Sequence, residues 1–199
     1  AAGQKLLALV TLTPIFIVVG YVTLLAFRRQ IHTGFMLLGQ LLNEAVNNVL
    51  KKAIKQPRPP SCNHPGYGMP SSHAQFMSFF AVYFLIWTVR RVSMGSAAEK
   101  VFLNAFVMAL SLAVLYSRVE LGYHTAEQVA AGGIIGTVFA ALWAALLAIV
   151  VEPVMPEIEK LWICRYFYLR DSKNIPNLLK FEYEAAMKTK DFFSKDKKN

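Results

Sequence analysis

The sequence predicts an all-α fold: a polytopic membrane helix bundle with about five transmembrane helices and a short cytosolic C-terminal tail. The 199 residues are 55% apolar, and their mean hydropathy is +0.40. Several apolar runs approach the length of about 20 residues with which a helix crosses the hydrocarbon core. Few charged residues interrupt these runs. The alternative, a soluble bundle of buried helices, does not explain so many long apolar runs in so short a chain.

Five runs are expected to span the membrane, at residues 6–25, 34–50, 73–89, 101–116 and 129–151. The second and third are short, and each is polar at one end. The first run resembles a signal peptide in position only. It is too long, it has no basic region beyond Lys5, and no small-residue cleavage pattern follows it.

The basic residues indicate how the chain is threaded. With five spans, 15 of the 21 Lys and Arg residues fall on one side of the membrane, including all ten that follow Val151. The positive-inside bias places that side in the cytosol. We therefore divide the chain into a transmembrane domain, residues 1–152, and a cytosolic tail, residues 153–199, with interfacial and amphipathic helical segments. Cys62 and Cys164 fall on opposite faces, so they are not expected to pair.

The polar segments that could carry chemistry lie on the other face, at residues 51–72 and 117–128. The first contains five of the nine prolines, a density that stiffens a loop. Each segment ends in a capping-box pattern, from Ser72 to Gln75 and from Thr125 to Gln128. The start of a helix offers unpaired N–H groups and a partial positive charge, so both positions suit an anion.

Basic residues and histidines accompany these two helix starts. They are Lys51, Arg58, Arg118, His73 and His124. A single interfacial Lys or Arg is more often an anchor, and a single His is more often a structural residue. Together they supply more donors than a carboxylate can use. A phosphate or diphosphate fits them better.

Three motifs in order resemble the signature of the type-2 phosphatidic acid phosphatase superfamily. They are Lys51 with Arg58-Pro59, Pro70-Ser71-Ser72-His73, and Ser117-Arg118 with His124. The stretches GMPSSHAQF, YSRVELGYHTAEQV and RDSKNIPNLLKFEYE are similar to the eukaryotic branch that acts on the dolichol carrier lipid. Two residues depart from the broad pattern. Ser72 replaces the usual Gly, and Gln128 replaces the Asp that usually orients the nucleophile; both departures are also found in that branch.

The resemblance implies an endoplasmic-reticulum membrane phosphatase with a lumenal site that hydrolyses dolichyl diphosphate, so residues 1–152 would be its phosphatase domain. His124 would be the nucleophile that forms a phosphohistidine, and His73 the acid and then the base. The substrate's oxygens would be held by Lys51, Arg58, Ser71, Ser72 and Arg118. We expect no cofactor and no metal, since no carboxylate cluster suits Mg²⁺. The expected partners are a polyprenyl diphosphate lipid and the bilayer, with no nucleic acid; nothing in the sequence sets an oligomeric state.

The group that orients His124 remains open between three candidates. Gln128 at i+4 and Glu127 at i+3 both lie beside His124 on a helix, and the third candidate is a backbone carbonyl or another side chain. Gln128 could also serve only to cap Thr125. A neutral residue is acceptable behind the nucleophile because diphosphate cleavage expels a phosphate monoester, whose second pKa is roughly 6.

Two rival functions remain. The same chemistry could act on phosphatidic acid, a sphingoid phosphate or a shorter polyprenyl diphosphate. A non-catalytic binder of anionic lipids is the other rival, although a binder needs no nucleophilic histidine. In the second run, Glu44 shares a face with Lys51 and could hold it in place, or could serve helix packing. The last residues, KDKKN, resemble a dilysine retrieval signal of endoplasmic-reticulum proteins.

Overall fold

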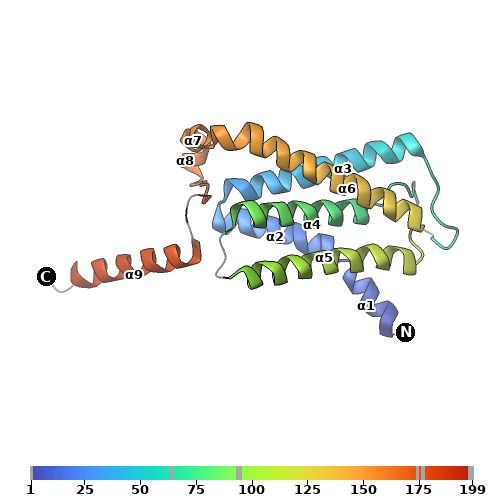
Figure 1. Cartoon of the computed structure of the whole chain (residues 1–199), viewed down its shortest axis with the longest axis horizontal. Helices are drawn as coiled ribbons and strands as arrows, with labels where there is room; N and C mark the ends of the chain where they lie inside the picture. The colour runs from blue at the N-terminus through green and yellow to red at the C-terminus, as the bar shows by residue number, and fades with distance from the viewer. Residues whose placement is uncertain (1, 63–64, 93–95, 174, 176–177, 197–199) are drawn as a thin grey trace.

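The computed structural model describes residues 2–62, 65–92, 96–173, 175 and 178–196. These residues form helices, apart from loops and one isolated β-bridge (Figure 1). The helices are α1 (Ala2–Val10), α2 (Thr13–Arg28), α3 (Ile31–Ile54), α4 (Ser72–Arg91), α5 (Ala97–Glu120), α6 (Ala126–Leu146), the π-helix η1 (Leu147–Val151), α7 (Glu152–Lys160), α8 (Trp162–Tyr166) and α9 (Leu178–Asp196).

Four helical runs in the described chain are long and apolar enough to cross a membrane. They comprise Gly3–Arg28, Ser72–Arg91, Ala97–Glu120 and Ala126–Lys160. The first joins α1 and α2 across a break before Pro14, and the last continues from α6 through η1 and α7. The all-α membrane bundle is therefore confirmed. Four helical runs have the length and apolar composition of a membrane span, and a fifth long helix, α3, lies beside them.

Helix α3 has the length of a span, at 24 residues, but it does not meet the combined hydropathy and charge criterion that the four runs meet. Its polar residues are buried against α4. Gln40 donates to the carbonyl of Phe76 (3.3 Å), and Asn43 donates to the carbonyl of Gln75 (3.3 Å). Polar groups at membrane depth are stable when another helix supplies their hydrogen bonds, which is how a polar α3 fits in the bundle.

Helix α4 is the centre of the bundle. Half of its most apolar 18-residue window is buried, against 22% or less in the other three spans. It packs against α3, α5 and α6, as Figure 1 shows. The contact with α6 is made by glycines. A Cβ added at Gly132 would lie 2.5 Å from the carbonyl oxygen of Ser71, and one at Gly136 would overlap the carbonyl of Gln75. The small-residue pair thus brings the two helices together at the start of α4.

The bundle has two polar ends. One end holds the loop after α3 and the α5–α6 junction, and we call it the site end. The other holds α7, α8 and the segment 170–173, and we call it the tail end (Figure 1). At the tail end, Ile31 donates its N–H to the carbonyl of Arg170 (3.0 Å), and Asp171 forms an ion pair with Arg91 (3.4 Å). Cys62 and Cys164 lie at opposite ends, and both are free, as expected.

Candidate active site

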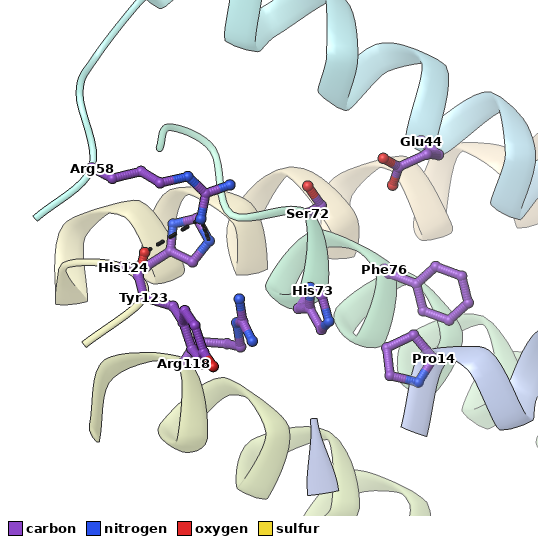
Figure 2. A pocket seen from close by; sticks show the side chains of 9 residues that line it. All are labelled: Pro14, Glu44, Arg58, Ser72, His73, Phe76, Arg118, Tyr123 and His124. Carbon is purple, nitrogen blue, oxygen red and sulfur yellow. Dashed lines mark hydrogen bonds between the residues drawn. The ribbon is translucent and has the colours of Figure 1, made fainter. Parts of the chain in front are cut away.

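A cavity of about 510 Å³, which we call the site cavity, opens at the site end. Residues from α2, α3, α4, α5 and both loops line it. They are Pro14, Glu44, Arg58, Ser72, His73, Phe76, Arg118, Tyr123 and His124 (Figure 2). Five of the eight residues predicted for the site are among them. The fold therefore brings the three motifs to one place.

The start of α4 differs from the predicted capping box. The N-cap is Ser71 rather than Ser72, and its side chain makes no cap hydrogen bond. The Gln75 side chain instead donates to Oδ1 of Asn43 (2.9 Å) and accepts from Nδ2 of Asn47 (2.8 Å). The prediction was wrong because Gln75 points into the bundle. A buried amide needs partners, and α3 supplies them there.

The second capping box, at the start of α6, is confirmed. The hydroxyl of Thr125 accepts from the N–H of Gln128 (3.3 Å), and Oε1 of Gln128 accepts from the N–H of Thr125 (3.4 Å). The N–H of Ser71 donates to the carbonyl of Gln128 (3.0 Å). This bond ties the start of α4 to the start of α6, so the regions that carry His73 and His124 are held together.

The two ring nitrogens of His124 have different partners. Nε2 lies 3.3 Å from Nη1 of Arg58, and Nδ1 lies 3.1 Å from Oε1 of Gln128. Arginine only donates, so Nε2 must be the acceptor and carries no proton. The proton is then on Nδ1 and is donated to Gln128. This tautomer leaves a lone pair on Nε2 at the cavity, which is the arrangement a nucleophile requires.

Of the candidate orienting groups, Gln128 occupies the position beside Nδ1. Its side chain is buried, whereas Glu127 is exposed. Gln128 also takes part in the cap of α6, so the capping and orienting interpretations hold together.

Burial lowers the pKa of His124 from 6.5 to about 4. The hydrogen bond to Gln128 opposes this shift, and the positive charges of Arg58 and Arg118 add to it. The imidazole is therefore neutral at neutral pH. A neutral ring with an unprotonated Nε2 can attack a phosphorus atom without first losing a proton.

The cations around the cavity are not neutralised by protein carboxylates. Within the described parts of the chain, no carboxylate lies within 4.0 Å of Lys51, Arg58 or Arg118. The guanidinium of Arg118 lies over the ring of Tyr123, 4.2 Å from its centre. In Figure 2, Arg58 reaches over the ring of His124, and Arg118 points between the two histidines. Cations that have no carboxylate partner favour an anionic ligand.

Three predicted residues lie outside the cavity lining. Lys51 reaches the site through a hydrogen bond from Nζ to the hydroxyl of Ser72. Ser71 is fully buried, and its hydroxyl has no partner among the described residues. Gln128 lies behind His124, as its contact with Nδ1 requires.

Sequence reasoning did not assign Pro14, Phe76 or Tyr123 to the site. Tyr123 directly precedes His124 in the sequence, and this could have indicated its place at the site. Nothing in the sequence indicates Pro14 or Phe76. Glu44 also lines the cavity. Its carboxylate lies 3.5 Å from Nδ2 of Asn48, and it makes no ion pair with Lys51. Among the residues described, no group of three or more His, Cys, Asp or Glu side chains could hold a metal ion.

The fold and the cavity define an integral-membrane helix bundle whose cavity is lined by two histidines and two arginines. The chain belongs to the PAP2 superfamily, whose profile matches residues 32–150, a range that contains every predicted site residue.

Within this superfamily, the chain is similar to the dolichyldiphosphatases. It is 44% identical over 185 residues to Dolichyldiphosphatase 1 of Dictyostelium discoideum, covering 90% of this chain and 81% of that relative. It is 41% identical over 191 residues to Dolichyldiphosphatase 1 of Homo sapiens, covering 91% and 80%. A more distant relative, Lipid phosphate phosphatase gamma of Arabidopsis thaliana, is 35% identical over 186 residues, covering 90% and 82%. No solved structure matches the chain.

Proposed function

We propose that this protein is a membrane hydrolase that cleaves dolichyl diphosphate to dolichyl phosphate and inorganic phosphate. Its cavity carries unpaired cations and an unprotonated ring nitrogen of His124. Its relatives at 41–44% identity are named dolichyldiphosphatases. The observation that carries the proposal is the tautomer of His124, because it presents a nucleophile to the cavity. The reaction would recycle the carrier lipid of protein N-glycosylation.

In the first step, the lone pair of His124 Nε2 attacks the terminal phosphorus. The N–P bond forms while the bond from phosphorus to the bridging oxygen breaks, and its electron pair leaves with dolichyl phosphate. His73 donates a proton to that oxygen. The leaving group is a phosphate monoester with a second pKa of roughly 6, so it departs with little assistance.

In the second step, His73 takes a proton from water, and the water oxygen attacks the phosphorus of the phosphohistidine. The N–P bond breaks, inorganic phosphate leaves, and His124 returns to the neutral ring. Phosphoryl oxygens are held throughout by Lys51, Arg58, Arg118, the Ser71 hydroxyl and the N–H groups near Ser72 and His73. Such positioning and charge stabilisation account for most of phosphoryl-transfer catalysis, and the cations take the place of a metal ion.

The site cavity faces the lumen of the endoplasmic reticulum, and the tail is cytosolic. This orientation is supported by the positive-inside bias. The α5–α6 junction, beside the cavity, and α9 lie at opposite ends of the bundle (Figure 1). Residues 1–152 form the phosphatase domain and residues 153–199 the tail, although the helical run itself continues to Lys160.

Most of the dilysine-like pattern falls on residues 197–199, which lie outside the described residues.

The test is phosphate release by the purified protein in EDTA from dolichyl diphosphate, dolichyl phosphate and phosphatidic acid. We expect dolichyl diphosphate to be preferred and EDTA to have no effect. Preference for phosphatidic acid would support the rival function, a phosphatase of other lipid phosphates. The Arabidopsis relative is named as a lipid phosphate phosphatase, so this rival is the one to compare. Loss of activity in EDTA, restored by Mg²⁺, would overturn the metal-free mechanism.

A further inference from the structure

The side-chain amide of Gln128 has four hydrogen-bonding neighbours. Its oxygen lies 3.1 Å from Nδ1 of His124 and 3.4 Å from the N–H of Thr125. Its nitrogen lies 2.8 Å from the carbonyl oxygen of Pro57 and 3.3 Å from Oε1 of Gln56. Two donors therefore face the oxygen, and two acceptors face the nitrogen. The reversed amide would place oxygen against oxygen, so only one orientation satisfies all four neighbours.

The loop after α3 also leaves room for this amide. A Cβ added at Gly68 would lie 2.5 Å from Oε1 and 2.6 Å from Nε2 of Gln128. The N–H of Gly68 donates to the carbonyl of Gln56 (2.8 Å), which holds these two residues together beside the amide. We call Gln56, Pro57 and Gly68 the amide cradle. The backbone φ of Gly68 is not positive, so its conformation does not require glycine. Glycine is needed there because a Cβ would overlap the Gln128 amide.

We propose that the amide cradle, acting at Nδ1 while Arg58 acts at Nε2, fixes the tautomer of His124 and that Gln56 is a positioning residue for the reaction. Only the kinetic consequence of this inference rests on the proposed function. A carboxylate at position 128 has no N–H to donate to the two carbonyl oxygens of the cradle, whereas an amide satisfies both. The loop is therefore matched to glutamine at this position, and Gln56 acts on His124 through Gln128.

The effect on catalysis follows from the proton on the ring. The cradle holds Oε1 of Gln128 beside Nδ1, which keeps the proton there and leaves the lone pair on Nε2. Without the Gln56 acceptor, one N–H of Gln128 loses its partner, and the amide can turn. Some His124 rings then carry the proton on Nε2 and cannot attack. Fewer competent molecules lower kcat, while KM is unchanged because no group that holds the substrate is altered.

The kinetic test compares Gln56→Met, which removes the acceptor at similar size, with Gln56→Glu, which keeps an acceptor oxygen. We expect Gln56→Met to lower kcat roughly three- to ten-fold, the range for loss of one hydrogen bond, and Gln56→Glu to recover most of that loss. Tyr67→Phe, at an exposed residue of the same loop, is the control. In a Gln128→Asp background, Gln56→Met should cause no further loss, because Asp has no N–H to leave unpaired. Equal losses in both backgrounds would mean a structural role and would overturn the proposal.

A second measurement needs no substrate. The ring nitrogens of ¹⁵N-histidine-labelled protein report the tautomer by NMR, and His124→Gln identifies the signals of His124. We expect the proton on Nδ1 in the unaltered protein and a new population with the proton on Nε2 in Gln56→Met. An unchanged tautomer in Gln56→Met contradicts the proposal whatever the rates. If the unaltered protein hydrolyses no diphosphate lipid, the proposed function fails, and the NMR result still decides the cradle.

Discussion

Nδ1 of His124 donates to Oε1 of Gln128 across 3.1 Å, within a single turn at the start of α6. The partner is a neutral amide, whereas most superfamily members are expected to have Asp at this position. His124 therefore has an acceptor that sets its tautomer but no negative charge that would favour its protonation. Burial then dominates, and it lowers the pKa of His124 to about 4. The pH dependence of the reaction should show this difference.

We expect kcat/KM to stay level as the pH falls from neutral through 6.5 and to halve only near pH 4, where His124 becomes protonated. The sign follows from the lowered pKa, because the reactive neutral ring persists to lower pH than in a free histidine. A pH profile of phosphate release from dolichyl diphosphate measures it. Gln128→Asp should move the acidic limb to higher pH, since a carboxylate favours the charged ring. An acidic limb that is the same in both proteins would exclude His124 as the titrating group.

His124→Ala should lower kcat at least about a thousand-fold, because it removes the nucleophile itself. Substrate labelled with ³²P at the terminal phosphate should transfer label to the protein, and the label should survive alkali but not acid, as a phosphohistidine does. His73→Gln should still become labelled and lose the label slowly, because water then lacks its base. Labelling of His124→Ala at the normal level would assign the nucleophile to another residue.

Gly136→Val should destabilise the bundle by about 1–3 kcal/mol, because its side chain would overlap the backbone of Gln75 in α4. Gly133→Ala is the matched control on the same helix. A Cβ there meets nothing closer than 3.5 Å, at the hydroxyl of Ser78. Thermal unfolding in detergent measures both variants. A Tm for Gly136→Val equal to that of Gly133→Ala would contradict the close packing of α4 and α6.

Asp171→Asn should loosen the tail end of the bundle. Arg91, whose side chain is 6% exposed, pairs with Asp171 at 3.4 Å and with Glu152 at 3.4 Å. Loss of one partner of a buried ion pair leaves charge uncompensated, so the segment 170–173 should detach more often. Trypsin cleaves after Arg170 and Lys173 and should cut the variant several-fold faster. Glu157→Gln, at an exposed pair with Lys160, should leave the cleavage rate unchanged.

Local patterns in the sequence predicted much of this protein. Apolar runs of spanning length predicted the membrane bundle, and the spacing of Lys51, Arg58, His73, Arg118 and His124 predicted an anion site at one end. Thr125 and Gln128 predicted the cap of α6. These features depend on residues a few positions apart or on whole-helix composition, which a sequence displays directly.

Other features depend on contacts between distant segments. The Ser72 cap was wrong because Gln75 bonds to α3, more than 25 residues earlier in the chain. The polar face of α3 is stable only because α4 covers it. Nothing local marks Gln56 or Gly68 as neighbours of Gln128.

The sequence by itself determined the class of fold, and it predicted two histidines that the structure places in one cavity. Only the tertiary structure decided which nitrogen of His124 carries the proton, because it places Arg58 at Nε2 and Gln128 at Nδ1. The physical reason is that apolar periodicity and motif spacing are properties of the chain. The direction of a hydrogen bond depends on donors and acceptors that meet only after the helices have packed.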